Sequence, residues 1–336
     1  MNNVSPVRVG CLGMGWWSDV LADAIARSGR LRIGSCFTRS DEKRRAFAAK
    51  YGCEPAPSYE AMLADPQIEA IINTTPNNVH LETTRAAARA GKHVFLDKPI
   101  ANTVAEGRAL TDACRAAGVV LGLGYQRRRE SHFRWVRARI DAGDFGRLVN
   151  AEANISRDRL GKIDLTSWRY QSAGMPGGVL LQIGIHYTDV LEYLMGPVVA
   201  VTGRLAQLVL PGDNPDVASV VLEHESGALS TLNASYASAG EYYLLNVYGK
   251  EATAYYDLHQ GLRYVTRGQA APSPVPCEPS DAIVSELDEF AEAVRGRGAP
   301  EMDGESSTRS LAVVLAGIRS AREGRRVAVA EMMETA

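Results

Sequence analysis

A histidine inside an apolar segment, GVLLQIGIHYTD, is the first candidate for chemistry in the sequence. The pattern predicts a helix over residues 177–195. Positions four apart on a helix share a face, so Gln182 and His186 should lie side by side, with Asp189 one turn further on. An imidazole that faces a pocket can act as general acid or base, because it exchanges a proton near neutral pH. The alternative is a histidine that only fills the core.

A lysine in KHVFLDKPIA is the second candidate. KHVFL predicts a strand, so Asp97, Lys98 and Pro99 should follow at its carboxyl end, where ligands of parallel sheets gather. The ammonium group of Lys98 could there orient a hydroxyl, polarise a carbonyl or lower the pKa of a neighbouring group. The alternative is an ordinary surface lysine.

The turn TPNNVH, residues 75–80, closes another predicted strand, IEAIINTT, at the same edge of the sheet. Its side chains are therefore candidates for ligand contacts. Asn77 has an equally good structural explanation, since asparagine often caps the helix that follows such a turn. From this turn we expect cofactor contacts at Thr75, Pro76, Asn77 and His80.

A glycine-rich turn, GCLGMGWWS at residues 10–18, follows the first predicted strand and opens the first helix. Gly13 would permit the tight turn, and Gly15 would let the backbone approach a pyrophosphate at the helix N-terminus. Ser18 replaces the third glycine of the dinucleotide motif, so the match is imperfect. The strand–turn–helix context favours a nucleotide over a plain β–α turn. The expected contacts are Gly13, Met14, Gly15, Trp16 and Trp17.

The end of the second predicted strand bears on the choice of nicotinamide cofactor. An acidic residue there would hold the ribose 2′-hydroxyl of NAD. The sequence has FTRS instead, so Arg39 could pair with the 2′-phosphate of NADP or stack on the adenine. Asp41 and Glu42 are expected in the first turn of the next helix. We therefore expect contacts from Thr38 and Arg39 and a preference for NADP over NAD; the alternative for Arg39 is a solvated loop cation.

The elements that must position these residues alternate between strand and helix. VRVGCL, LRIGSCF, IEAIINTT, KHVFL and VVLGLGY predict strands, and residues 16–28, 40–51, 78–90 and 103–117 predict helices. This alternation is typical of a parallel sheet covered on both faces, and right-handed crossovers make it a doubly wound α/β domain. We expect this NAD(P)-binding Rossmann domain to span residues 1–125.

After residue 125 the pattern changes. A basic helix at about 129–142 precedes the strand RLVNAEANIS, and after the helix at 177–195 come six segments of period-two alternation: VAVTGRLAQLVL, VASVVLEHE, ALSTLNASYA, YYLLNVYG, ATAYYDL and LRYVT. They predict a large, mostly antiparallel sheet. Two helices, at about 281–296 and 305–323, follow. We expect a second α/β domain over residues 126–336.

Composition excludes several classes of partner. The chain has 336 residues, of which 46% are hydrophobic, which suits two domains. A net charge of −2 argues against nucleic acid and anionic membranes. The sequence contains neither an apolar run of bilayer length nor the pattern of a secretory signal. The cysteines form no CxxC pair, so we expect free thiols in a reducing cytoplasm and no metal site.

Taken together, these motifs resemble one family. KHVFLDKPIA is similar to the GKHVxxEKPxA stretch of the Gfo/Idh/MocA oxidoreductases, and VRVGCLGMGWW, TTPNNVH and GYQRRR (124–129) also match. GGVLLQIGIHYTDVLEYLMG resembles the family's GGxxxDxGxHxxD helix. The resemblance implies a Rossmann domain, a second domain with an open sheet, and NAD(P)-dependent chemistry on sugars, inositols and related alcohols. It also implies homodimers or homotetramers that associate through the open sheet.

The resemblance assigns roles residue by residue. Lys98 matches the catalytic lysine and His186 the general acid or base, while Asp97 stands for the usual Glu and Gln126 joins the cofactor contacts. Gln182 stands where the family usually has an Asp, whose charge would raise the pKa of His186. The glutamine amide can orient the His186 ring by a hydrogen bond but carries no charge. Three hypotheses stay open: Lys98 handles more of the proton transfer, His186 acts on a more acidic hydroxyl, or Gln182 binds substrate.

The expected mechanism places a substrate C–OH between Lys98 and His186. In the oxidation direction His186 accepts the hydroxyl proton while hydride moves to the nicotinamide. Lys98 stabilises the developing alkoxide.

Residues that could recognise the substrate precede the predicted catalytic helix. The loop 156–176 is expected to roof the pocket, where Trp168 could stack on a ring. Arg169, with Arg127 or Arg157, could bind a carboxylate or phosphate, although arginines in this stretch also suit a solvated helical face. Asp189 is counted among the pocket residues, mainly as a group that orients the helix. The substrate would be a secondary alcohol or ketone of a sugar, inositol or ring diol, with a carboxylated diol equally admissible.

Two other functions fit the same features. A dinucleotide-binding regulator without turnover would explain Gln182 but not the retention of Lys98 and His186. A glycoside-modifying enzyme with tightly held NAD would oxidise its sugar only transiently and show no net change in cofactor.

Overall fold

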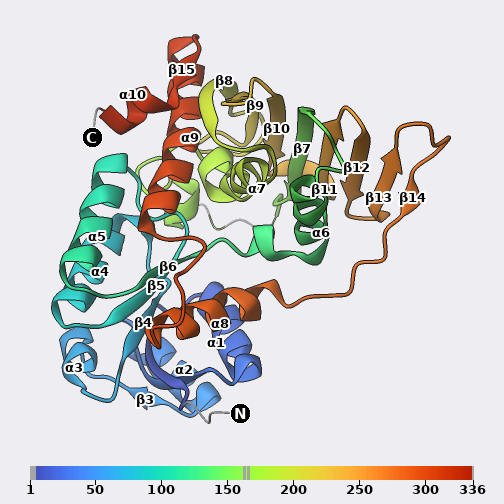
Figure 1. Ribbon diagram of the computed structural model, residues 1–336. Coiled ribbons are helices and arrows are strands. Elements are labelled where there is room, and N and C mark those ends of the chain that lie inside the picture. Colours follow the sequence, from blue (N-terminus) through green and yellow to red (C-terminus); the bar gives the residue numbers. More distant parts are fainter. Residues whose placement is uncertain (1–4, 162–163, 165–166, 335–336) are drawn as a thin grey trace. The chain divides into compact units, whose positions relative to one another are not determined.

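The computed structural model describes residues 5–161, 164 and 167–334, and the chain divides into two compact units (Figure 1). The first unit contains Met1–Gln126 and Asp281–Thr308, and the second contains Arg127–Ser280 and Arg309–Ala336. The predicted boundary after residue 125 lies one residue from the observed one. The assignment of residues 281–308 to the second domain was wrong, because this segment returns to the first unit.

The first unit is built around a parallel sheet of six strands in the order β3-β2-β1-β4-β5-β6. The strands are β1 (Val7–Leu12), β2 (Leu31–Phe37), β3 (Glu54–Pro55), β4 (Ala70–Asn73), β5 (His93–Asp97) and β6 (Leu121–Gly124). The helices are α1 (Trp16–Ser28), α2 (Asp41–Tyr51), α3 (Tyr59–Ala64), α4 (His80–Arg89), α5 (Val104–Ala116) and α8 (Ala282–Val294). The prediction of a doubly wound α/β domain is confirmed. The sequence did not predict the two-residue strand β3 or the short helix α3.

The helix α8 completes the core of this unit from far along the chain. Leu287, Phe290 and Ala291 on α8 are buried in one apolar cluster with residues of β1, α1 and β2. Phe290 meets Phe95 of β5 edge to face at a centroid distance of 5.6 Å. Gly122 on β6 leaves room for it, since a Cβ there would lie 3.1 Å from the Phe290 ring. The apolar face of α8 therefore explains why residues 281–308 belong to the first unit.

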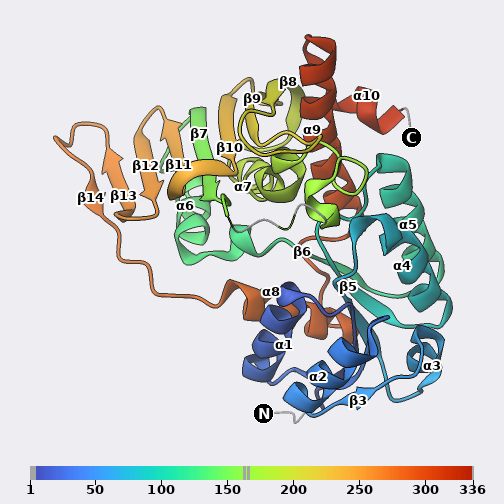
Figure 2. The same cartoon turned by 180° about the vertical axis from the view of Figure 1, so that it is seen from behind.

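The second unit contains a nine-stranded sheet in the order β14-β13-β12-β11-β7-β10-β9-β8-β15 (Figure 2). Its neighbours pair antiparallel except β7 and β10, which pair parallel. The strands are β7 (Leu148–Asp158), β8 (Val198–Ala206), β9 (Val217–His224), β10 (Leu229–Ser235), β11 (Ala237–Gly249), β12 (Ala252–Asp257), β13 (Gly261–Thr266), β14 (Ser273–Pro274) and β15 (Val327–Ala328). The prediction of a mostly antiparallel sheet is confirmed, while β14 and β15 were not expected.

Helices lie on one face of this sheet. They are α6 (Ser131–Asp141), α7 (Ile185–Met195), α9 (Gly304–Glu323) and α10 (Val329–Glu334), of which α9 begins in the first unit. Along β10, Ser230, Leu232 and Ala234 are buried while the residues between them are exposed. The opposite face presents apolar side chains in the single chain: Val149, Val199, Val221 and Leu229 are each at least 38% exposed.

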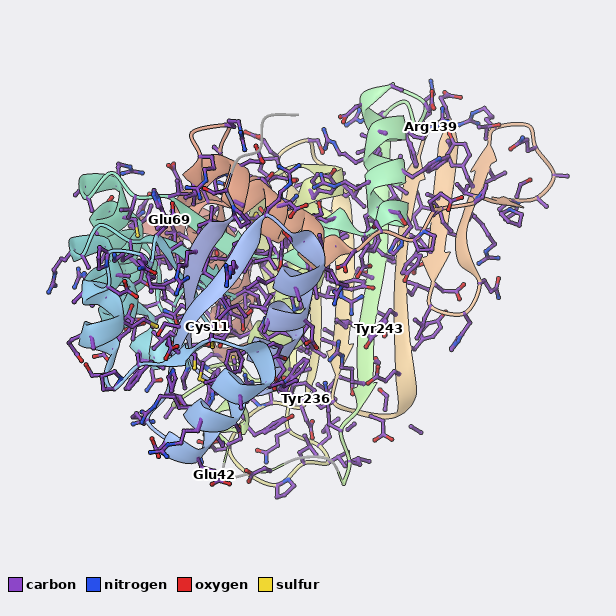
Figure 3. The ribbon with its side chains drawn as sticks, turned by 90° about the horizontal axis from the view of Figure 1, so that it is seen from below. Cys11, Glu42, Glu69, Arg139, Tyr236 and Tyr243 are labelled. Atoms are coloured by element: carbon purple, nitrogen blue, oxygen red, sulfur yellow. The ribbon has the colours of Figure 1, made fainter. Side chains whose placement is uncertain are left out.

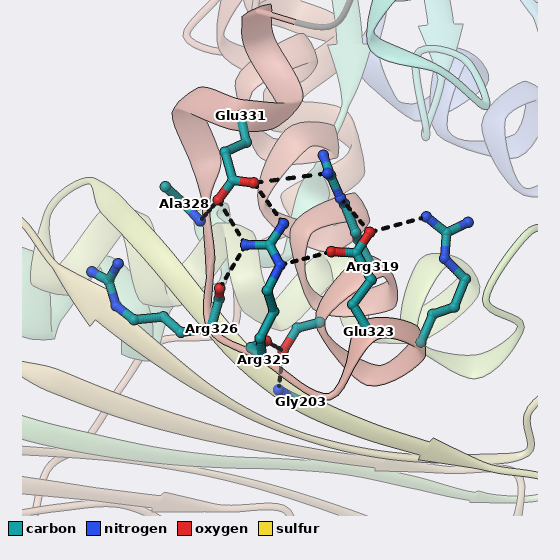
Figure 4. Close-up of polar contacts among 9 residues, drawn as sticks. Gly203, Arg319, Glu323, Arg325, Arg326, Ala328 and Glu331 are labelled. Carbon is teal, nitrogen blue, oxygen red and sulfur yellow. Dashed lines mark hydrogen bonds and ion pairs between the residues drawn. The ribbon is translucent and has the colours of Figure 1, made fainter.

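The end of the chain is anchored at the β8 edge by polar contacts (Figure 4). The Ser320 hydroxyl accepts from the backbone N–H of Gly203 on β8 at 3.0 Å and donates to the carbonyl of Arg325 at 2.5 Å. Arg325 pairs with Glu323 and with Glu331, each at 2.7 Å. These contacts hold β15 and α10 against the sheet. Among the described residues, no helix has the length and apolar character needed to cross a membrane.

Candidate functional site

The glycine turn of the first unit forms an open helix N-terminus. Gly13 has a φ of 87°, and a Cβ there would lie 3.0 Å from the carbonyl group of Thr74, so only glycine suits this position. Gly15 is the N-cap of α1 and has no side-chain cap, and a Cβ at this position would meet no other described residue within 4 Å. The Ser18 N–H donates to the Gly15 carbonyl at 3.0 Å, and the open space at Gly15 before the uncapped start of α1 fits a pyrophosphate.

The three large side chains of this turn differ in exposure. Trp16 is 61% exposed and meets Trp17 edge to face at 5.2 Å. Met14 and Trp17 pack partly against the apolar core. Trp16 is thus free to contact a ligand, whereas Met14 and Trp17 mainly support the turn.

Cations gather at the end of β2. Arg39 is exposed and makes no ion pair with any described residue, which fits both a phosphate-binding cation and a solvated loop cation. Arg44, which the sequence reading overlooked, donates to the Thr38 carbonyl at 3.2 Å and lies 5.6 Å from the Phe37 ring. Asp41 pairs with Arg44 and Arg45, so it is occupied as the first-turn residue of α2. Among the described residues, no carboxylate at the end of β2 is therefore available to bind the ribose 2′-hydroxyl of NAD.

The turn after β4 is held by a buried asparagine that the sequence reading missed. The Asn73 side-chain oxygen accepts from the Thr75 backbone N–H at 3.1 Å and from the Thr75 hydroxyl at 2.7 Å. Asn77 is buried and donates to Asn102, beyond β5, at 3.1 Å. The turns after β4 and β5 are thus joined. Asp97 ends β5 and Lys98 follows it, and both residues are half-buried.

His80 does not lie where a cofactor contact requires. Its side chain has no exposed surface, and its Nε2 lies 2.8 Å from the Thr75 carbonyl oxygen. Its Nδ1 lies 3.0 Å from the carbonyl oxygen of Pro99. Burial lowers the pKa of His80, and these backbone contacts oppose that shift. The expectation that the His80 side chain contacts the cofactor is therefore corrected: the ring faces the main chain.

The helix that carries His186 begins differently from the prediction. Gly177 and Gly178 have positive φ angles of 76° and 48° and form a turn instead of the first helical residues. A π-helical turn, Leu180–Gly184, carries Gln182 and leads directly into α7. His186, in the first turn of α7, is 8% exposed. Such π turns are frequent at functional sites because they reorient the side chains that follow.

Arg127 lies against aromatic rings of the second unit. Its guanidinium carbon is 4.7 Å from the Tyr243 ring and 5.9 Å from the Tyr187 ring, and its Nη1 donates to Glu130 at 3.0 Å. Burial acts to lower the pKa of Arg127, but Glu130 and the neighbouring tyrosines together outweigh it and raise the pKa. Arg157 lies over the same Tyr243 ring at 5.6 Å, so two cations share one aromatic side chain of β11. Figure 3 labels Tyr243.

Asp189 is paired inside the second unit. Its carboxylate accepts two hydrogen bonds from Arg128, one of them from Nε at 3.0 Å, and only 1% of the residue is exposed. This pair ties α7 to the segment before α6. It agrees with the helix-orienting role that the sequence suggested for Asp189, and it leaves the carboxylate facing Arg128 instead of solvent.

The aromatic loop before the π turn is described in part, because residues 162–163 and 165–166 of the predicted roof lie outside the described residues. The Arg169 guanidinium lies 4.6 Å from the Trp168 ring, and Tyr170 meets Tyr236 at 5.8 Å. A cavity of about 10 Å³ lies among Arg169, Tyr170, Gly178, Leu210, Pro211, Asn214, Pro215 and Tyr236. Its volume suits a single water molecule.

Models of two protein families match most of the chain. Residues 7–125 match an oxidoreductase family described by an NAD-binding Rossmann fold. Residues 133–255 match the GFO/IDH/MocA C-terminal domain.

Individual relatives cover nearly the whole chain. The chain is 30% identical to a 1,5-anhydro-D-fructose reductase of Ensifer adhaerens over 327 residues, which cover 93% of this chain and 97% of the relative. It is 26% identical to an inositol 2-dehydrogenase of Rhizobium meliloti, across 96% of this chain and 99% of the relative. A crystal structure described as a putative NADPH-dependent oxidoreductase from Desulfitobacterium hafniense superposes with a TM-score of 0.92 at 32% identity, covering 98% of this chain and 99% of that chain.

Proposed function

Because the chain belongs to the Gfo/Idh/MocA family of NAD(P)-dependent oxidoreductases, we propose that it transfers a hydride between NADP and a secondary alcohol or ketone of a sugar, inositol or related ring diol. The observation that carries this proposal is the common edge of the parallel sheet. The Gly13 turn follows β1 and Lys98 follows β5, and both strands end at that edge.

The residues of the first unit fit a dinucleotide. The open N-terminus of α1 would receive the pyrophosphate, and Thr38 and Arg39 would receive the adenosine end. Thr75, Pro76, Asp97 and Gln126 are proposed around the nicotinamide end. When bound, the nicotinamide supplies or accepts the hydride.

The protein side of the reaction is proton transfer and charge stabilisation. Lys98 donates a hydrogen bond to the substrate oxygen and stabilises negative charge that develops there. His186 accepts the hydroxyl proton in oxidation and returns it in reduction. Gln182, on the π turn before His186, orients the ring or the substrate through its amide and adds no charge.

Two arginines of the second unit support a substrate that carries an acidic group. Arg127, which pairs with Glu130, shares the Tyr243 ring with Arg157, and a substrate carboxylate near that ring would accept hydrogen bonds from guanidinium groups. Trp168 and Arg169 are proposed to contact the ring of the substrate. A carboxylated sugar or ring diol is accordingly the substrate class that we favour.

The test is a nicotinamide absorbance assay over polyols, ketosugars and carboxylated ring diols. Lys98→Ala and His186→Ala should each lower turnover at least about 100-fold, since each removes a group that handles charge or a proton. Lys50→Ala is the matched control, because Lys50 pairs with Asp19 at the surface of α2. Wild-type rates in both variants would overturn the residue assignment.

The same assay separates the other functions. Gln182 in place of the family's Asp favours a regulator that binds NADP without turnover, and such a protein would bind cofactor but convert no substrate. An enzyme that oxidises its sugar transiently would consume substrate without a net absorbance change.

Cofactor choice and assembly are tested separately. Arg39→Glu should weaken NADPH binding about tenfold or more and spare NADH, because it replaces the partner of the 2′-phosphate with a like charge. We propose that a second copy of the chain covers the exposed apolar face of the nine-stranded sheet, giving a homodimer or homotetramer in the cytoplasm. Light scattering on the purified protein would show a monomer if this is wrong.

A further inference from the structure

His80 joins two loops of the first unit through their main chains. Its ring is fully buried at the start of α4, with Nε2 2.8 Å from the carbonyl oxygen of Thr75. On its other side, Nδ1 lies 3.0 Å from the carbonyl oxygen of Pro99 and 3.3 Å from that of Ile100. All three oxygens are acceptors, so any N–H on the ring donates to backbone.

These loops are the ones that follow β4 and β5. Pro99 is bonded directly to Lys98, and the Thr75 turn is fixed from its other side by Asn73. A ring between the two carbonyl groups therefore sets the spacing between the Thr75 turn and the main chain from which the Lys98 side chain extends.

We propose that His80 is a positioning residue, which acts through the backbone carbonyl groups of Thr75 and Pro99 to place the Lys98 ammonium group against the substrate oxygen. This inference rests on the proposed function, in which Lys98 contacts that oxygen. His80 itself touches neither substrate nor cofactor.

A neutral imidazole donates one N–H to a carbonyl on one side, and its flat ring keeps the two carbonyl groups apart. Glutamine keeps an amide N–H donor but lacks the ring. Phenylalanine fills the space and donates to neither. The two substitutions therefore remove the contacts in steps while keeping much of the volume.

The experiment compares His80→Gln and His80→Phe in the full-length protein, alone and combined with Lys98→Ala. We expect kcat to fall about 3- to 10-fold in His80→Gln and about 30- to 100-fold in His80→Phe, because displacements near 1 Å cost rates of that order. The NADPH dissociation constant, measured by titration calorimetry, should change less than about threefold. The backbone amides of Lys98, Ile100 and Ala101 should exchange hydrogen faster in His80→Gln.

The matched control is His93→Gln. His93 lies at the opposite end of β5, where its Nδ1 accepts from the Val120 backbone N–H at 2.9 Å. This variant should lose some thermal stability and keep kcat within about twofold.

The double variants decide between positioning and general support of the fold. If His80 acts through Lys98, His80→Gln should cost almost nothing further once Lys98 is alanine. The same loss of kcat with and without Lys98, or unchanged kcat and amide exchange in His80→Gln, would overturn the inference. If His80→Phe does not fold, His80→Gln alone carries the test. Full activity of Lys98→Ala would instead refute the proposed role of Lys98, a separate result.

Discussion

The two units build their candidate sites by different means. In the first unit, backbone groups shape the site around the side chains of Arg39 and Lys98: an open helix N-terminus lies at Gly15, and His80 contacts the carbonyl groups of the flanking turns. In the second unit, charged and aromatic side chains form it, and the adjacent Arg127 and Arg128 differ in their partners. Arg128 pairs with the buried Asp189, while Arg127 pairs with Glu130 and lies on Tyr243. A site built from main-chain groups depends on the local conformation of its turns. A site built from side chains depends on partners that are distant in the sequence.

The largest effect on stability is expected at the buried Arg128–Asp189 ion pair of the second unit. Asp189→Asn leaves the Arg128 guanidinium buried without its counter-charge and should lower the free energy of unfolding by about 3–5 kcal/mol. Chemical denaturation measures it. Asp141→Asn, which breaks an exposed pair with Arg137, is the control and should cost less than about 1 kcal/mol. Equal losses in the two variants would show that burial of the pair does not matter.

Substitutions at Gly13 and Gly15 test the main-chain site of the first unit. Gly15→Ala should fold normally, since its Cβ meets open space, yet bind NADPH about 10- to 100-fold more weakly because the methyl group would occupy the pyrophosphate position. Gly13→Ala should instead lower stability by about 1–3 kcal/mol, because alanine is strained at a φ of 87°. Calorimetry and thermal melts distinguish the two. Unchanged NADPH affinity in Gly15→Ala would place the nucleotide elsewhere.

A buried carboxyl group on α7 predicts a pH dependence specific to the second unit. Burial raises the pKa of Glu192 to about 7. The folded state therefore holds a proton that the unfolded state has lost, and the stability linked to Glu192 falls as pH rises from about 4.5 to 7. Glu192→Gln should accordingly stabilise the protein by about 1–3 kcal/mol at pH 8 and have little effect at pH 4.5.

Melting curves at the two pH values check this prediction, and Glu223→Gln is the control. Arg326 holds the pKa of Glu223 below its usual range, so this variant should lose slight stability at pH 8. A gain for Glu192→Gln that is the same at both pH values would contradict the linkage.

The smallest effect is expected at the chain end shown in Figure 4. Arg325 holds the pKa of Glu331 at about 2, but both side chains face solvent. Glu331→Gln should therefore shift the melting temperature by less than about 2 °C, because exposed ion pairs contribute little. A larger shift, measured by calorimetry, would mean that the anchor at the β8 edge supports the whole second unit.

Prediction from sequence succeeded where the determinants are local. The strands β1 and β2 and the helix α1 were located to the residue, because apolar runs end at glycines and polar caps. The start of the helix with His186 was misplaced, since composition does not reveal the conformations of Gly177 and Gly178 or a π turn.

Long-range partners were beyond the reach of sequence patterns. Arg128 and Asp189 stand 61 positions apart, and His80 meets Pro99 only through the tertiary fold. His80 was therefore assigned to the cofactor because it follows a strand end, although its ring turns inward. The resemblance to a family supplied roles for Lys98 and His186, but it could not supply the contacts that hold them.

The interrupted course of the chain also constrains synthesis on the ribosome. When residues 1–126 have been synthesised, the first unit still lacks α8. The apolar surface that Leu287 and Phe290 later cover is therefore exposed to solvent while residues 127–280 are translated. At typical elongation speeds this interval is on the order of ten seconds. During this interval the incomplete first unit is prone to aggregation and proteolysis. A chain truncated before residue 281 would lack α8 and could not complete the first unit.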